Sequence, residues 1–233
     1  MRKINAIAFK ELTALFGSPL AYVVLFLSTA VFNIFFFMII DQNREAHLKD
    51  IFTVMEFLLV FFVPIFTMKS FAEENASGTM EFLLTAPVRK IEIVLGKFAG
   101  IKIFLFCVIA PTFVYYFIFS HFADFDKVTA LWGYLGIWLE VNFFAAIGLF
   151  ISSLCRSQVV AAMSTYVILF ILYFSMSFKM YVEGKLNVLV SYIAVMSHSE
   201  NFFTGIFLLS DVVYFLSGII FFLLLTRLML NRQ

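Results

Sequence analysis

The chain has 233 residues, of which 63% are hydrophobic and only 13% charged, with a formal net charge of +1 and a mean hydropathy of +1.02. A water-soluble domain contains roughly 45–50% apolar residues, so this composition excludes a soluble globular protein and indicates an integral membrane protein. The phosphate-binding loop, HExxH and GxSxG patterns are absent from the sequence, and the two cysteines lack metal-ligand spacing. We therefore expect no catalytic residue, metal or cofactor in this chain, and no nucleic-acid partner.

Residues 1–17 combine apolar positions at helical spacing with charged positions on the remaining side. Lys10 and Glu11 interrupt the apolar run that a cleaved signal peptide would need. The pattern instead predicts an amphipathic helix that lies in the membrane interface. The Gly17-Ser18-Pro19 break then lets the chain turn into the bilayer.

Six apolar stretches are long enough to cross a membrane, which takes about 20 helical residues. Each must be a helix because lipid offers no partners for open backbone groups, so the predicted fold class is all-α, one six-span transmembrane domain over residues 1–233. The predicted spans are Leu20–Ile40, Ile51–Phe71, Ile93–Phe119, Leu131–Leu154, Val159–Phe178 and Val212–Leu230.

Lysine and arginine residues gather on one side of these spans, the side of the N-terminus. Such residues favour the cytoplasmic side, so both termini and the loop after the second span are predicted to be cytoplasmic. The five that fall on the other side are Arg44, Lys49, Lys127, Lys179 and Lys185.

Four residues inside the spans predict local geometry. Pro64 and Pro111 are expected to kink the second and third spans. Gly133 and Gly136 are expected to allow close contact of the fourth span with a neighbouring helix.

The loop between the second and third spans, Ser70–Lys102, is the longest polar, mixed-charge run of the chain. Gly78 permits a sharp turn, and Ser77 or Thr79 can cap a short helix after it. Pro87 ends that helix because proline disfavours a helical residue before it. The helix would offer the apolar side chains of residues 82–84 to the groove of a partner protein.

Basic residues follow this short helix at the entry to the third span. They could bind lipid phosphates or acidic groups of the partner, or they could merely follow the positive-inside rule. These residues are Arg89, Lys90, Lys97 and Lys102.

The segment 179–211, before the last span, contains two apolar runs that are too short to cross a membrane, Leu186–Met196 and Asn201–Ser210. They predict a pair of short helices that enter the outer leaflet and return. Ser197 and Glu200 have the spacing of a capping box, and Asp211 is expected to cap the last span.

Two acidic residues fall inside predicted spans, where charge is costly and therefore often functional. Glu140, followed by Asn142, lies near the middle of the fourth span, and Glu56 lies in the second. These residues could face a translocation path, or their hydrogen bonds to neighbouring helices could fix the packing.

The chain resembles the permease subunits of type 2 ABC transporters, the ABC-2 exporter family. The residues that carry the resemblance lie mainly in the loop: Glu73-Glu74, Gly78-Thr79, Glu81, Leu83-Leu84, Pro87, Ile91 and Gly96-Lys97. The short length is most similar to permeases of the gliding-motility and copper-maturation type. The resemblance implies the same plan of an N-terminal interfacial helix, six spans and a re-entrant helical pair before the last span.

In that family the loop carries a coupling helix that docks on the ATPase, which places the coupling segment at residues 72–92. The coupling residues implied by the resemblance are Glu73, Glu74, Gly78, Thr79, Glu81, Phe82, Leu83, Leu84, Pro87 and Arg89. The implied complex has two ATPase subunits, which hold ATP and magnesium, and a second permease copy, identical or related. The implied location is the bacterial cytoplasmic membrane, among lipids and with a periplasmic or auxiliary protein as a further partner.

The first interpretation is therefore an ATP-driven transporter subunit that forms the translocation path with a second permease. A second is a permease that transmits force to a periplasmic partner without moving a solute. A third, an ion channel or proton-coupled carrier without an ATPase, rests on Glu56 and Glu140.

Overall fold

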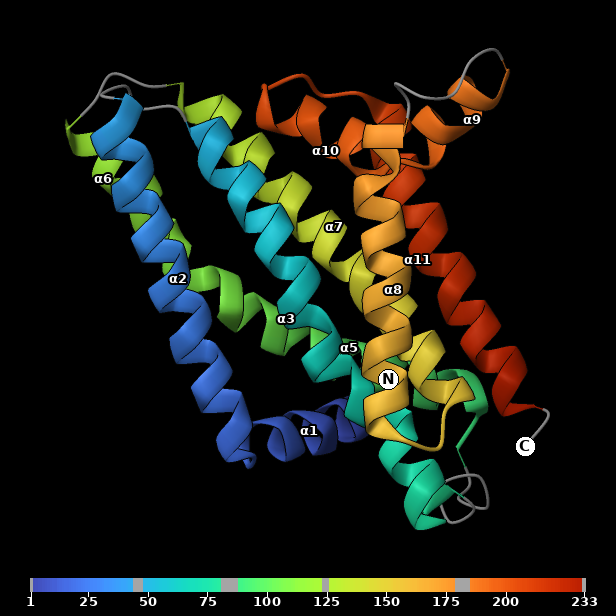
Figure 1. The fold of residues 1–233 in the computed structure, drawn as a ribbon. Coiled ribbons are helices and arrows are strands. Elements are labelled where there is room, and N and C mark those ends of the chain that lie inside the picture. Colours follow the sequence, from blue (N-terminus) through green and yellow to red (C-terminus); the bar gives the residue numbers. More distant parts are fainter. Residues whose placement is uncertain (1, 44–47, 81–87, 123–125, 179–184, 232–233) are drawn as a thin grey trace.

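The structure, a computed structural model, describes residues 2–43, 48–80, 88–122, 126–178 and 185–231. The described residues are almost entirely helical and include no strand, which confirms the predicted all-α class (Figure 1). Six candidate membrane spans are long and apolar enough to cross a bilayer. They are α2 (Pro19–Asn43), α3 (Leu48–Ser77), α5 (Lys90–Ile109) continued by α6 (Phe113–Phe122), α7 (Lys127–Leu154), α8 (Gln158–Phe178) and α11 (Leu209–Leu230).

Helices α3 and α5 continue well into the region that the sequence suggested was a loop. Helix α3 ends only at Ser77, and α5 begins at Lys90. The expected Ser70–Lys102 loop is therefore wrong in extent, because contacts with other helices keep both ends helical beyond the apolar stretch. The connection is confined to residues 78–89.

The third span is interrupted where proline was expected to kink it. Pro111 lies in a short 3-10 turn, Ala110–Thr112, that separates α5 from α6. The Tyr134 hydroxyl of α7 donates to the Thr112 carbonyl at the end of this turn, at 2.6 Å. Helix α3, by contrast, runs as one helix through Pro64.

Helix α7 forms the centre of the bundle. In its most apolar stretch 78% of the residues are buried, against 22% for α2 and 17% for α11. The predicted close contacts are confirmed, since a Cβ at Gly133 would lie 2.1 Å from the Phe52 ring, and one at Gly136 would lie 2.7 Å from Phe202. Glycine thus lets α7 pack closely against its neighbours.

The bundle has two distinct ends (Figure 1). At one end α1 (Arg2–Phe16) lies across the base of the spans, and we call this the α1 end. At the other end lie two short helices, α9 (Lys185–Ile193) and α10 (Val195–Phe203), and we call this the α10 end. Both the amphipathic helix and the helical pair are thus present; their depth in the membrane stays a prediction.

Two details of the predicted caps at the α10 end are wrong. Ser197 lies inside α10, whose N-cap is Ala194, and its hydroxyl donates to the Ser191 and Ala194 carbonyls. Asp211 lies in the first turn of α11 after the N-cap Leu208. Its carboxylate is instead bound by side chains of α10, so it joins two helices and caps neither.

Candidate functional site

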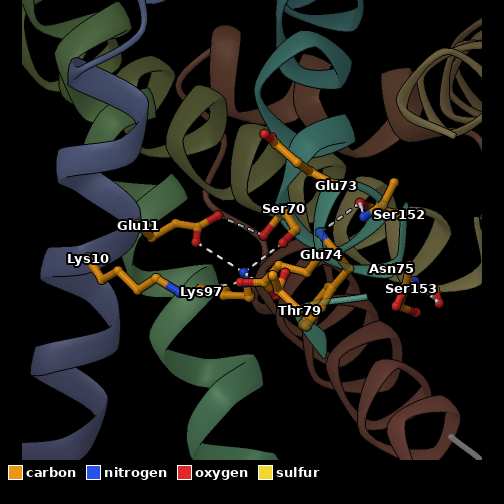
Figure 2. Close-up of polar contacts among 12 residues, drawn as sticks. Lys10, Glu11, Ser70, Glu73, Glu74, Asn75, Thr79, Lys97, Ser152 and Ser153 are labelled. Atoms are coloured by element: carbon orange, nitrogen blue, oxygen red, sulfur yellow. Dashed lines mark hydrogen bonds and ion pairs between the residues drawn. The ribbon is translucent and has the colours of Figure 1, made fainter. Parts of the chain in front are cut away.

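A buried group of charged side chains joins α1, α3 and α5 at the α1 end (Figure 2). Lys97 of α5 is 2% exposed. Its ammonium lies 3.2 Å from a Glu11 oxygen of α1 and 3.0 Å from a Glu74 oxygen of α3. It also donates to the Ser70 carbonyl at 2.6 Å, and the Ser70 hydroxyl donates to Glu11 at 2.8 Å. We call Lys10, Glu11, Ser70, Glu74 and Lys97 the Lys97 cluster.

The Lys97 cluster is balanced in charge. Lys10 lies 3.5 Å from the second Glu74 oxygen, so two ammonium groups face two carboxylates. Burying a charge is expensive unless it is paired and hydrogen-bonded. Lys97 meets that condition through two carboxylates and one carbonyl. The buried Lys97 therefore holds three helices together through charges that compensate one another.

Two glycines on α5 bring α1 close enough for these contacts. Gly96 and Gly100 are four residues apart, on one face of the helix. A Cβ at Gly96 would lie 2.6 Å from the Ile7 Cβ, and one at Gly100 would lie 2.8 Å from the Glu11 Cβ. Small residues at this spacing allow two helix backbones to approach closely. The glycines thus bring Glu11 within reach of Lys97.

A serine of α7 fixes the end of α3 from the other side. The Ser152 hydroxyl donates to the Met68 carbonyl and accepts the Phe71 and Ala72 amides, all at 3.0 Å. A hydroxyl has one donor and two acceptor sites, so Ser152 is fully satisfied. One turn later, Asn75 donates to the Cys155 carbonyl at 3.1 Å. The last two turns of α3 are therefore bound to α7 as well as to α1 and α5.

Replacing Ser152 with alanine should lower the free energy of unfolding by about 1–3 kcal/mol, because it removes three buried hydrogen bonds between α7 and the backbone of α3. Ser153→Ala is the matched control, since the Ser153 hydroxyl donates only to the Phe150 carbonyl of its own helix. Thermal unfolding in detergent measures both. Equal losses for the two variants would contradict the role given to Ser152.

The residues that flank the predicted coupling segment, at the end of α3 and at the start of α5, have defined conformations and contacts. After α3, Gly78 has φ of +71°, a left-handed conformation that glycine adopts without strain. Before α5, the Arg89 amide donates to the Glu92 carboxylate at 2.8 Å. The Lys90 ammonium donates to the Leu230 carbonyl at the end of α11. The segment thus leaves α3 at a fixed turn and returns on a helix that is tied to α11.

The structure places the predicted coupling residues as follows. Glu74 belongs to the Lys97 cluster, whereas Glu73 is exposed. Thr79 is exposed, and its hydroxyl lies 2.8 Å from that of Ser77. Arg89 is exposed at the start of α5. Glu81, Phe82, Leu83, Leu84 and Pro87 lie outside the described residues.

A pocket of about 540 Å³ opens beside the cluster, between α1 and the end of α3. Its lining carries both signs of charge: Lys10 and Lys69 are basic, and Glu11 and Glu73 are acidic. A surface of this kind suits a partner that itself presents both acidic and basic groups.

The three candidates for the translocation path lie in the other half of the bundle. Glu56 and Glu140 are 1% and 0% exposed, and the Ser199 hydroxyl of α10 donates to Glu56 at 2.8 Å. Asn142 does not join them, because residues two apart on a helix face different sides. Its amide instead donates to the Trp138 carbonyl of its own helix.

Sequence reasoning missed the central role of Lys97, which it treated with the basic residues at the membrane surface. The Gly96-Lys97-Phe98-Ala99-Gly100 spacing was the available signal, because it predicts a close helix partner around that lysine. It also missed the pair of His198 and Asp211, whose Nδ1 and Oδ1 atoms are 2.7 Å apart. Nothing local in the sequence connects those two residues.

Comparison with known families gives one match. The model of the ABC-2 family transporter protein matches residues 20–229 of the chain. No curated protein matches the chain.

Proposed function

The chain belongs to the ABC-2 transporter family and is a permease subunit of an ABC transporter, and from this we propose that separate ATPase subunits drive it through residues 72–92. In this proposal two ATPase subunits, which bind ATP and magnesium, dock on the short segment after Gly78. Two permeases, identical or related, form the translocation path in the bacterial cytoplasmic membrane, with the α1 end and both termini in the cytoplasm.

The observation that carries the proposal is the attachment of the end of α3. The Lys97 cluster ties it to α1 and α5, and Ser152 ties it to α7. A push on the segment after Gly78 therefore cannot be absorbed by a loose hinge at Ser77. It moves α3, α5 and α7 together, and of these α3 and α7 continue as single helices toward the α10 end (Figure 1).

The exposed apolar faces support a second permease copy as partner. Helix α8 exposes Val159, Met163 and Ile171, each by about 60% or more, on a helix that is long enough to span the membrane. Such faces must be covered by lipid or by another protein. Two copies that meet along part of this surface would place the path between them.

A pulldown of the ATPase tests the docking site. Replacing Phe82, Leu83 and Leu84 with aspartate removes the apolar patch of the segment. Each well-packed interface anchor costs about 2 kcal/mol or more when lost, so binding should fall at least ~100-fold. The matched control places three aspartates at residues 206–208, an exposed apolar run at the opposite end of the bundle, and should retain the ATPase.

Normal binding by the variant at residues 82–84, in membranes where both proteins are present at wild-type amounts, would contradict the proposal.

ATPase assays of the purified complex distinguish solute transport from force transmission. ATPase stimulation by a small solute supports transport. Stimulation by a periplasmic protein alone supports the force-transmitting alternative.

A further inference from the structure

Two buried carboxyl groups meet at the centre of the α10 half of the bundle. Glu56 of α3 and Glu140 of α7 are 1% and 0% exposed. Their side chains are within hydrogen-bonding reach of each other. The Ser199 hydroxyl of α10 donates to Glu56 at 2.8 Å. The pair thus lies where α3, α7 and α10 come together.

The hydrogen bonding of this pair is incomplete if both groups are ionised. Neither oxygen of Glu140 receives a hydrogen bond from any donor in the described part of the chain. Two carboxylates can only accept, so a bond between Glu56 and Glu140 requires a proton on one of them. With that proton, Glu140 donates to Glu56, and Glu56 receives bonds from both Glu140 and Ser199.

The surroundings offer no other compensation for two negative charges. Within the described ranges, no ion pair joins either carboxyl to a cation. Glu200 of α10 adds a further negative charge nearby, and the ammonium of Lys49 is 2.9 Å from Glu200. Tyr173 of α8 and Tyr214 of α11 are also near the pair, but the Tyr214 hydroxyl donates to the Ile193 carbonyl at 2.8 Å.

The imidazole of His198, next to Ser199, is already bound to Asp211. Two uncompensated carboxylates in an apolar interior would repel each other and lack solvation. Carboxyl pairs that share one proton avoid this cost.

We propose that Glu56 and Glu140 together bind one proton, taken up from the side of the membrane where α10 lies, and that α10 stays packed on α3 and α7 only while it is bound. The proton would enter past Glu200, whose side chain, next to Ser199, is 51% exposed. Loss of the proton leaves two negative charges beneath Ser199. Alkaline conditions on that side therefore release α10, and acidic conditions keep it packed.

Infrared spectroscopy of the full chain in lipid nanodiscs tests the shared proton. At neutral pH the wild type should show the band of a protonated carboxyl, shifted by exchange into deuterium oxide, because exposed carboxylates are ionised there. Glu140→Gln and Glu56→Gln should each remove the band. Glu200→Gln, the same substitution at an exposed position, should keep it.

Hydrogen exchange of the α10 amides tests the consequence for packing. After correction for intrinsic rates, exchange in the wild type should rise at least ~10-fold from acidic to alkaline pH. In Glu140→Gln it should stay slow throughout, because the carboxamide donates to Glu56 permanently. Absence of the band in the wild type, its survival in Glu140→Gln, or pH-independent exchange of α10 in the wild type would overturn the proposal.

Discussion

Replacing Lys97 with methionine should lower the free energy of unfolding by about 3–5 kcal/mol, the cost typical of removing one partner from a buried ion pair. The variant leaves the Glu11 and Glu74 carboxylates side by side without the ammonium that lies 3.2 and 3.0 Å from them. It also leaves the Ser70 carbonyl without its donor. We expect α1 to separate from α3 and α5, and ATPase activity in the assembled complex to become independent of the permease.

Two variants distinguish the loss of charge balance from a general loss of lysine. Lys10→Met removes a 3.5 Å pair whose lysine is 67% exposed, and exposed pairs contribute at most about 1 kcal/mol. Combining Lys97→Met with Glu11→Gln and Glu74→Gln removes the uncompensated charges and should restore most of the stability. Denaturation in detergent measures all three. A Lys97→Met variant as stable as the wild type would contradict the role of the cluster.

Replacing Gly100 with leucine should detach α1 from α5. Even a Cβ at this position would lie 2.8 Å from the Glu11 Cβ and 3.0 Å from the Ala8 carbonyl oxygen. Backbone atoms cannot move aside without shifting the whole helix, so α1 must move. Overpacking of this kind costs about 1–3 kcal/mol, and it also removes Glu11 from Lys97. The summed effect should approach that of Lys97→Met.

Limited proteolysis within residues 2–16 reports whether α1 has been released, and it should be markedly faster in Gly100→Leu. Ala99→Leu is the control, because Ala99 is on the same turn of α5 but is only partly buried. Cleavage at the wild-type rate in Gly100→Leu would show that α1 stays on α5 despite the larger side chain, and would contradict the close packing described for this pair.

The six spans were predictable because their signal is local. Each is an apolar run of membrane length, and lipid permits few alternatives to a helix. The extent of the loop was not predictable on the same basis. Hydropathy marks only the part of α3 inside the bilayer, whereas the helical turns up to Ser77 depend on Ser152, which is 80 residues away from Ala72.

The candidate site likewise contains some residues that were predictable from local sequence and others that were not. Gly78 was correctly placed at a turn, since only glycine adopts its backbone conformation easily. Lys97 was not recognised, because its partner Glu11 is 86 residues away and a single sequence carries no record of that pairing. Asp211 was assigned to a cap by its position near a helix start. Its real partners, His198 and Asn201, come from another helix.

The glycines of α7 have a consequence for the evolution of this chain. The ring of Phe52 fills the space that a side chain at Gly133 would need, and the Thr67 side chain does the same at Gly148. A larger residue at either position fits only if its partner on α3 shrinks. Positions 133 and 52, and positions 148 and 67, must therefore change as covarying pairs. Exposed positions such as Ile220 and Leu224 on α11 are free to exchange one apolar residue for another independently.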